Sequence, residues 1–172
     1  MLSGRYEYAI DDKGRLSIPA KFRDILASRC EPQKRRIEDH YITERASAKK
    51  TAGPPVELKL ILTNLDGCIV AYPESEWEEL QGRIARSAIA RKEAKNFLRF
   101  FYSGASDCPI DRLGRILIPQ YLRNYAAIKK NVVIVGMTTK IEIWAEEAWS
   151  EVMNRVTSDP DQMADIASEL DL

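Results

Sequence analysis

Residues 10–23 read IDDKGRLSIPAKFR, and residues 110–123, one hundred positions later, read IDRLGRILIPQYLR. Seven of these fourteen positions are identical: Ile, Asp, Gly, Arg, Ile, Pro and Arg, in that order. A weaker match pairs residues 60–80 with residues 132–152 through a shared apolar pattern. Because an internal repeat sets the architecture of a protein, we predict one structural unit that occurs twice. The first copy carries 28 additional residues between Arg23 and Leu60.

Each copy has the residue order of a β-hairpin followed by a short helix. Tyr6 to Ile10 is an apolar, β-favouring run that ends at the turn-forming residues 11–14,. Leu16 and Ile18 then alternate with polar residues, as in a half-buried strand,. Pro19 ends that strand because it lacks a backbone donor, and it suits the first turn of a helix. The same order recurs around residues 110–123.

Further along each unit, two apolar runs predict a pair of strands followed by a helix with an acidic start. The runs are residues 60–62 with 69–72 in the first copy, and residues 132–137 with 141–144 in the second. The fold class is therefore mainly β with helices, or α+β. The predicted organisation is repeat 1 at residues 5–75 with a polar insert at about 28–57, a helical connector at 76–103, repeat 2 at 104–150, and an acidic tail at 157–172.

The connector shows two apolar stripes at helical spacing, which we predict to be core. They are Trp77, Leu80 and Ile84, and then Ala94, Phe97, Leu98 and Phe101. Basic residues four apart (Arg91, Lys95 and Arg99) lie on another face. Such a face can touch phosphates, but it is more often simply solvated.

Bulk composition describes an ordinary globular chain with an uneven charge distribution. The 172 residues are 45% apolar and 30% charged, and no apolar run approaches the ~20 residues of a membrane span,. We therefore expect a cytoplasmic protein. The three cysteines are scattered, so neither a disulfide framework nor a zinc site is expected,. The net charge is zero, but the tail holds five acids and no base, so residues 1–156 carry +5.

The pattern Asp-x-x-x-Arg spans each predicted hairpin tip, as Asp11 with Arg15 and Asp111 with Arg115. An aspartate before the turn can hold the guanidinium after it, either within one hairpin or across a two-fold partner. Basic residues surround these pairs: Lys13, Arg15, Lys21 and Arg23 in the first copy, and Arg112, Arg115 and Arg123 in the second. A basic two-stranded ribbon fits the DNA major groove. A structural ion pair on a soluble hairpin explains the same residues about equally well.

Four segments together resemble the MraZ family of the AbrB-like superfamily: DDKGRLSIPAKFR, LDGCIVAYPESEWEEL, RFFYSGASDCPIDRLGRILIP and IEIWAEEAW, in that order. The resemblance implies a double-split β-barrel formed by the two halves of one chain. It also implies a nucleoid-associated transcriptional regulator that assembles into a ring-like homo-oligomer. Such a regulator binds short direct repeats in double-stranded DNA, upstream of its own cell division and cell wall gene cluster.

Carried over by position, the resemblance assigns DNA contact to Lys13, Arg15, Lys21 and Arg23. It assigns Asp11, Asp111 and Arg115 to holding the hairpins or the subunit interfaces. The second copy has Leu113 where the first has Lys13, and Tyr121 where the first has Lys21. Our hypothesis is that the less basic second hairpin is better suited to subunit contact.

Other functions remain open at this point. AbrB-type antitoxins use the same barrel for DNA and an acidic tail for a toxin, and this chain also has an acidic tail. An enzyme is not expected, because the only histidine, His40, lies in the polar insert and no catalytic motif is present,. We expect no cofactor, no metal, no membrane partner and no small-molecule substrate. A purely structural ring is a further alternative, and it predicts no salt-sensitive affinity for DNA.

Overall fold

The structure is a computed structural model that describes residues 1–29, 58–87 and 92–171. Cys30, His40, Arg91 and nearly all of the predicted polar insert therefore lie outside the described residues. The described chain combines helices with antiparallel sheets, so the predicted α+β class is confirmed. None of its described helices has the length and hydropathy needed to span a lipid bilayer.

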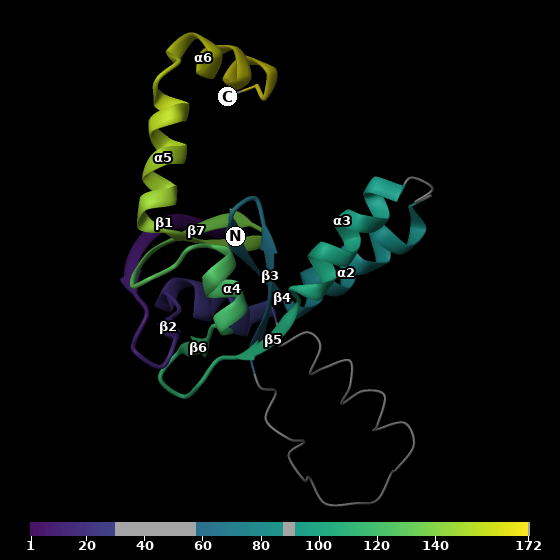
Figure 1. Cartoon of the computed structure of the whole chain (residues 1–172), viewed down its shortest axis with the longest axis vertical. Coiled ribbons are helices and arrows are strands. Elements are labelled where there is room, and N and C mark those ends of the chain that lie inside the picture. Colours follow the sequence, from purple (N-terminus) through teal and green to yellow (C-terminus); the bar gives the residue numbers. More distant parts are fainter. Residues whose placement is uncertain (30–57, 88–91, 172) are drawn as a thin grey trace, which may run out of the picture.

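Six strands form one antiparallel sheet in the order β1, β7, β8, β4, β3, β5 (Figure 1). Their bounds are β1 Leu2–Ala9, β3 Lys59–Leu65, β4 Cys68–Pro73, β5 Ser106–Pro109, β7 Asn131–Thr138 and β8 Lys140–Ala145. The predicted strand pairs are confirmed as β3 with β4 and β7 with β8. Since β4 also pairs with β8, the two pairs lie side by side in the centre of the sheet.

The two copies of the repeated segment exchange strands, so the prediction of a self-contained hairpin in each copy is wrong. β1 pairs with β7, and β5 pairs with β3. β2, Arg15–Ser17, pairs with β6, Arg115–Leu117, in a separate two-stranded sheet. A three-residue strand that ends before a proline offers few ladder bonds to a neighbour. Because β2 pairs with β6 of the other copy, Leu16 and Ile116 lie opposite one another and are completely buried.

Alternating side chains bury both faces of the central strands. Ile69 and Ala71 of β4 belong to the main core, which also contains the β2–β6 pair. Cys68 and Val70, which alternate with them along β4, belong to a second cluster with Trp77. Burial raises the pKa of the Cys68 thiol to about 12, so this cysteine acts as an uncharged core residue.

The helices surround this framework, and two pairs project from it in Figure 1. Residues 20–29 are helical, followed by α2 Glu74–Arg86, α3 Lys92–Ser103, α4 Gln120–Tyr125, α5 Glu146–Thr157 and α6 Pro160–Glu169. Trp77 and Phe101 are buried as predicted, but Phe97 is 49% exposed, against our prediction of a core stripe. α2 and α3 project away from the sheet in Figure 1, which leaves their outer turns far from the main core.

Two arginines fasten the crossed repeats together. Arg23 Nε donates to the carbonyl of Ile18, and its guanidinium packs on Gly114 of the other copy. Arg123 makes the equivalent bond to Ile118 and packs on Gly14. Each turn is thus covered by an arginine from the opposite repeat, and we call these contacts the arginine clasps.

The clasps predict an unequal response to alanine at two turn glycines. Gly14 has φ +82°, and Gly67, in the β3–β4 turn, has φ +78°. Alanine at either position adopts a left-handed conformation that costs ~1–2 kcal/mol. A methyl group at Gly14 also lies 2.9 Å from Arg123 Cζ, whereas at Gly67 no atom of the described residues lies within 4 Å.

Gly14→Ala should therefore lower the free energy of unfolding by about 1 kcal/mol more than Gly67→Ala, since it also displaces a hydrogen-bonded arginine. Urea denaturation of the two variants measures this difference. Equal losses would contradict the packing of Arg123 on Gly14.

Candidate nucleic-acid interface

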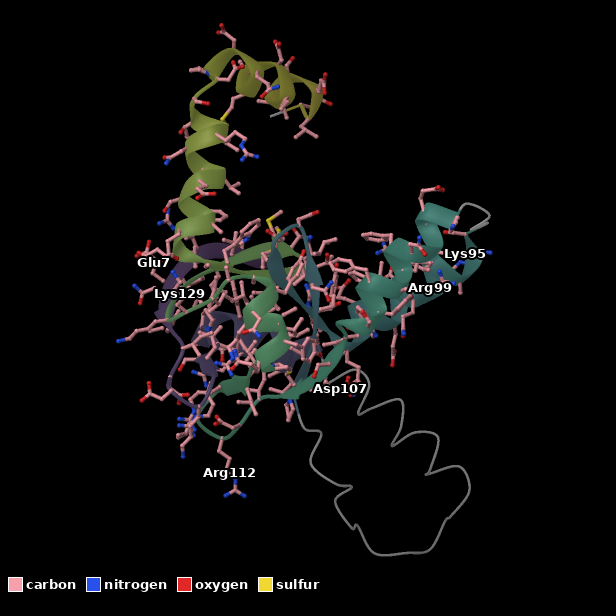
Figure 2. All side chains as sticks on the ribbon, in the orientation of Figure 1. Glu7, Lys95, Arg99, Asp107, Arg112 and Lys129 are labelled. Carbon is pink, nitrogen blue, oxygen red and sulfur yellow. The ribbon has the colours of Figure 1, made fainter. Side chains whose placement is uncertain are left out.

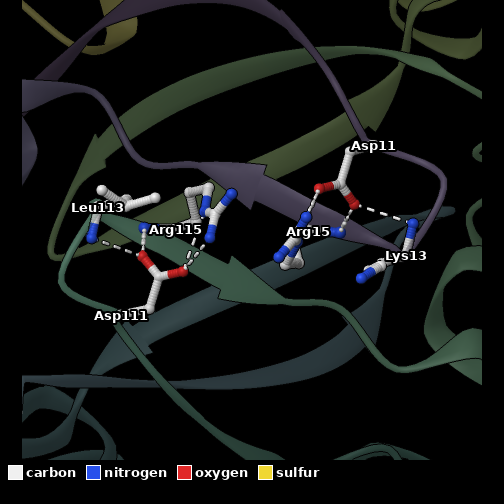
Figure 3. A network of polar contacts seen from close by, with 6 residues as sticks. All are labelled: Asp11, Lys13, Arg15, Asp111, Leu113 and Arg115. Atoms are coloured by element: carbon white, nitrogen blue, oxygen red, sulfur yellow. Dashed lines mark hydrogen bonds and ion pairs between the residues drawn. The ribbon is translucent and has the colours of Figure 1, made fainter.

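Each turn of the repeated segment is organised by one aspartate carboxylate. Asp11 Oδ1 accepts from the backbone N–H of Lys13 at 3.0 Å and of Arg15 at 2.9 Å. Asp111 Oδ1 accepts in the same way from Leu113 and Arg115, both at 2.9 Å. An aspartate that satisfies the backbone of its own turn pre-organises the loop. Figure 3 shows the two turns with these bonds.

The second oxygen of each carboxylate holds the arginine that leaves the turn. Asp11 Oδ2 lies 2.7 Å from Arg15 Nε and 2.6 Å from its Nη2. Asp111 Oδ2 lies 2.9 Å from Arg115 Nε and 2.7 Å from its Nη2. Both pairs form within one turn, which is the first of the two arrangements that the spacing left open. The fork contact fixes the direction of each guanidinium while leaving it partly exposed,.

These contacts lower the pKa of both carboxyl groups, with a different leading cause in each turn. For Asp11 the largest cause is the hydrogen bond from the backbone of Arg15, and its side chain adds to the effect. For Asp111 the side-chain hydrogen bond from Arg115 is the largest cause, followed by its backbone N–H. Both aspartates therefore stay ionised well into the acidic range.

The four residues predicted to contact DNA occupy different environments. Lys13 is exposed at the turn, and Arg15 is half-buried beside Asp11. Lys21 is exposed on the first helix, with Nζ 3.5 Å from the Ser3 carbonyl. Arg23 is half-buried in an arginine clasp, so it supports a turn. Sequence reasoning missed that supporting contact, although glycine and this arginine are among the residues identical in both copies.

The two turns lie at one end of the molecule, next to the β2–β6 sheet (Figure 1). Arg112 in the second turn points outward from that end (Figure 2). With Lys13 and the two fixed arginines, Arg15 and Arg115, the end carries cationic groups from both copies. Such an arrangement can bind phosphates through mobile ammonium groups and planar acceptors through fixed guanidinium groups.

The carboxyl geometry predicts how the turns respond to acid. Both aspartates should titrate below the ordinary value of 3.8. Because the folded-state pKa is lower than the unfolded one, their stabilisation is present above the unfolded pKa and is lost as pH falls through the folded pKa. Carbon-detected NMR titration of the side-chain carboxyls measures both midpoints.

Truncating the arginines should separate the two causes. Arg115→Ala removes the leading cause at Asp111, so its pKa should rise clearly. Arg15→Ala keeps the backbone donor that leads at Asp11, so that pKa should rise less. A larger rise at Asp11 than at Asp111 would contradict this assignment.

Comparison with known proteins identifies the family. A family model described as "MraZ protein, putative antitoxin-like" matches residues 1–31 and 101–168. Three similar proteins are each named transcriptional regulator MraZ. The protein of Heliobacterium modesticaldum is 34% identical over 100% of both chains. That of Caldicellulosiruptor bescii is 37% identical over 99% of both, and that of Pelotomaculum thermopropionicum is 36% identical over 100% of this chain and 99% of its own. The resemblance seen in the sequence is confirmed, and the chain belongs to the MraZ family.

Proposed function

We propose that this chain is a sequence-specific DNA-binding transcriptional regulator, and not an enzyme. It binds short direct repeats in the promoter of its own cell division and cell wall gene cluster, in the cytoplasm and at the nucleoid. The observation that carries this proposal is the pair of aspartate-organised turns, which hold Arg15 and Arg115 in fixed directions at one end of the molecule. The regulator name of the three similar proteins supports it.

Within this proposal the exposed and the fixed cations have different tasks. Lys13 and Lys21 are exposed and suit phosphate oxygens, which position a protein on DNA without reading sequence,. Arg15 is oriented by Asp11, as a side chain that reads a guanine edge through two parallel hydrogen bonds must be,. Arg23 acts indirectly, because its clasp supports the turn at Gly114. Asp11, Asp111 and Arg115 hold the turns or lie at subunit interfaces.

We further propose that the two sheets together make the double-split β-barrel of AbrB-like proteins, and that subunits assemble into a ring. One guanine contact contributes only ~1–3 kcal/mol of discrimination. Several identical turns that engage several identical DNA boxes raise avidity by ~100 to 10,000-fold if their spacing matches. Head-to-tail subunits present their turns in one direction, which suits direct repeats.

An antitoxin-like role is the second candidate, because the matching family model carries that description. The exposed α6, in the acidic tail, is the segment that such a role would use. A regulator and an antitoxin share the DNA contact, so they differ only in whether α6 binds a toxin.

Binding titrations on DNA from upstream of the chain's own gene cluster test the proposal. The comparison DNA has the same composition with the repeats scrambled. Arg15→Ala should weaken binding to the native DNA by about 10- to 100-fold, because one base contact is lost, and should affect the scrambled DNA less. Lys13→Leu installs the residue of the second copy. It should weaken binding to both DNAs by a similar factor and should reduce the slope of log affinity against log salt concentration by about 1.

Arg83→Ala is the matched control, since Arg83 is an exposed base on α2, in the projecting helix pair. It should leave both affinities unchanged. Equal affinity of the wild type for native and scrambled DNA would reject the regulator proposal. Unchanged binding by a folded Arg15→Ala protein would reject only the assignment of Arg15.

A further inference from the structure

α6 is an amphipathic helix, and no described residue packs against most of its apolar face. Met163, Ile166 and Leu170 recur at three and four positions, so they form one stripe along the helix and its last turn,. All three are exposed, and within α6 only Ala167 is as much as half-buried. A helix of 10 residues is marginal by itself in water, because helical stability in proteins comes mainly from packing an apolar face,.

A second uncovered apolar surface lies where α3 meets α4. Its members are four exposed aromatic residues, Phe97, Phe100, Tyr121 and Tyr125, which we call the aromatic patch. Phe100 and Tyr125 have ring centroids 5.6 Å apart. The Tyr121 hydroxyl donates to the carbonyl of Gly104, just after α3, and the Tyr125 hydroxyl accepts from the N–H of Gly67. These bonds fix the positions of the two tyrosine rings in the patch.

The charges beside the two surfaces are opposite. α3 contains three bases, Lys92, Lys95 and Arg99, and one acid, Glu93, a net charge of +2. Lys95 and Arg99 lie along the projecting α3 (Figure 2), and neither forms an ion pair with a described residue. Residues 157–172 carry five acids and no base, a net charge of −5. Opposite potentials of this size steer association and select the partner.

The two surfaces of one molecule do not meet. In Figure 1, α6 lies at the top of the view and covers neither α3 nor α4. The aromatic patch is accordingly exposed in the same structure. We infer that the apolar stripe of α6 docks on the aromatic patch of a second copy of this chain, with the acidic tail beside that copy's Lys95 and Arg99.

This contact joins two different surfaces, so it is heterologous and leaves one of each free on a dimer. Repeated addition then closes into a ring if the rotation between subunits permits. The inference rests on the proposed self-assembly and assigns surfaces to it. The inferred contact uses neither Lys13 nor Arg15.

Two single substitutions test the contact from its two sides. Ile166→Asp breaks the apolar stripe outside both cores, and Tyr121→Lys replaces a patch residue with the residue of the first copy. Each variant alone should lose the oligomer and sediment at the monomer mass of 19.6 kDa. An equimolar mixture should form a dimer of twice that mass, because each variant supplies the surface that the other lacks. Analytical ultracentrifugation measures all three samples.

Ser168→Asp makes an equal charge change on another face of α6, and Tyr8→Lys changes an exposed tyrosine of β1. Both should keep the wild-type mass. If the wild type is itself a monomer, the proposed ring and this inference both fail. If the wild type is an oligomer that Ile166→Asp leaves intact, or if the mixture forms no dimer, only the inferred contact is overturned, and the DNA-binding proposal still stands.

Discussion

The crossed pairing of β2 with β6 is the contact on which the rest of the molecule depends. It places Leu16 and Ile116 opposite each other in the core. Each copy closes only its own turn, and the strand that follows the turn pairs with the other copy. Two backbone hydrogen bonds continue the crossing beyond the strands. The N–H of Ile18 donates to the carbonyl of Gly114, and the N–H of Ile118 donates to the carbonyl of Gly14. Since each repeat completes the other, the two copies must fold as one cooperative unit, although they are related as a duplication.

The same crossing explains why the turns can hold charged side chains in fixed directions. A two-stranded sheet of three-residue strands would be marginal alone. Here its buried side chains anchor it in the core, and an arginine from the opposite copy covers each turn glycine. Because the backbone is held, both oxygens of each aspartate can accept hydrogen bonds within their own turn. Rigid support behind a surface side chain is what a selective contact requires.

The sequence alone predicted the elements well, because apolar alternation and proline are local signals. The pairs β3–β4 and β7–β8 were predicted from such runs, and the Asp11–Arg15 contact from its spacing. The exchange of β2 between copies was not predictable, because a strand shows the same alternation whichever neighbour it pairs with. The role of Arg23 was missed for a related reason: its partner Gly114 is distant in sequence and becomes a neighbour only through the exchange. The exposure of Phe97 depends on how far α3 projects, which helical periodicity does not encode.

Duplication followed by divergence then accounts for the difference between the two copies. Positions that build the turns and the crossing are shared: the aspartate and first arginine of each turn, and the glycine and second arginine of each clasp. Exposed positions have diverged, with Leu113 and Tyr121 where the first copy has Lys13 and Lys21. Because these side chains lie on the surface, their exchange costs little folding free energy. The two copies can therefore differ at these exposed positions without disturbing the core that both build.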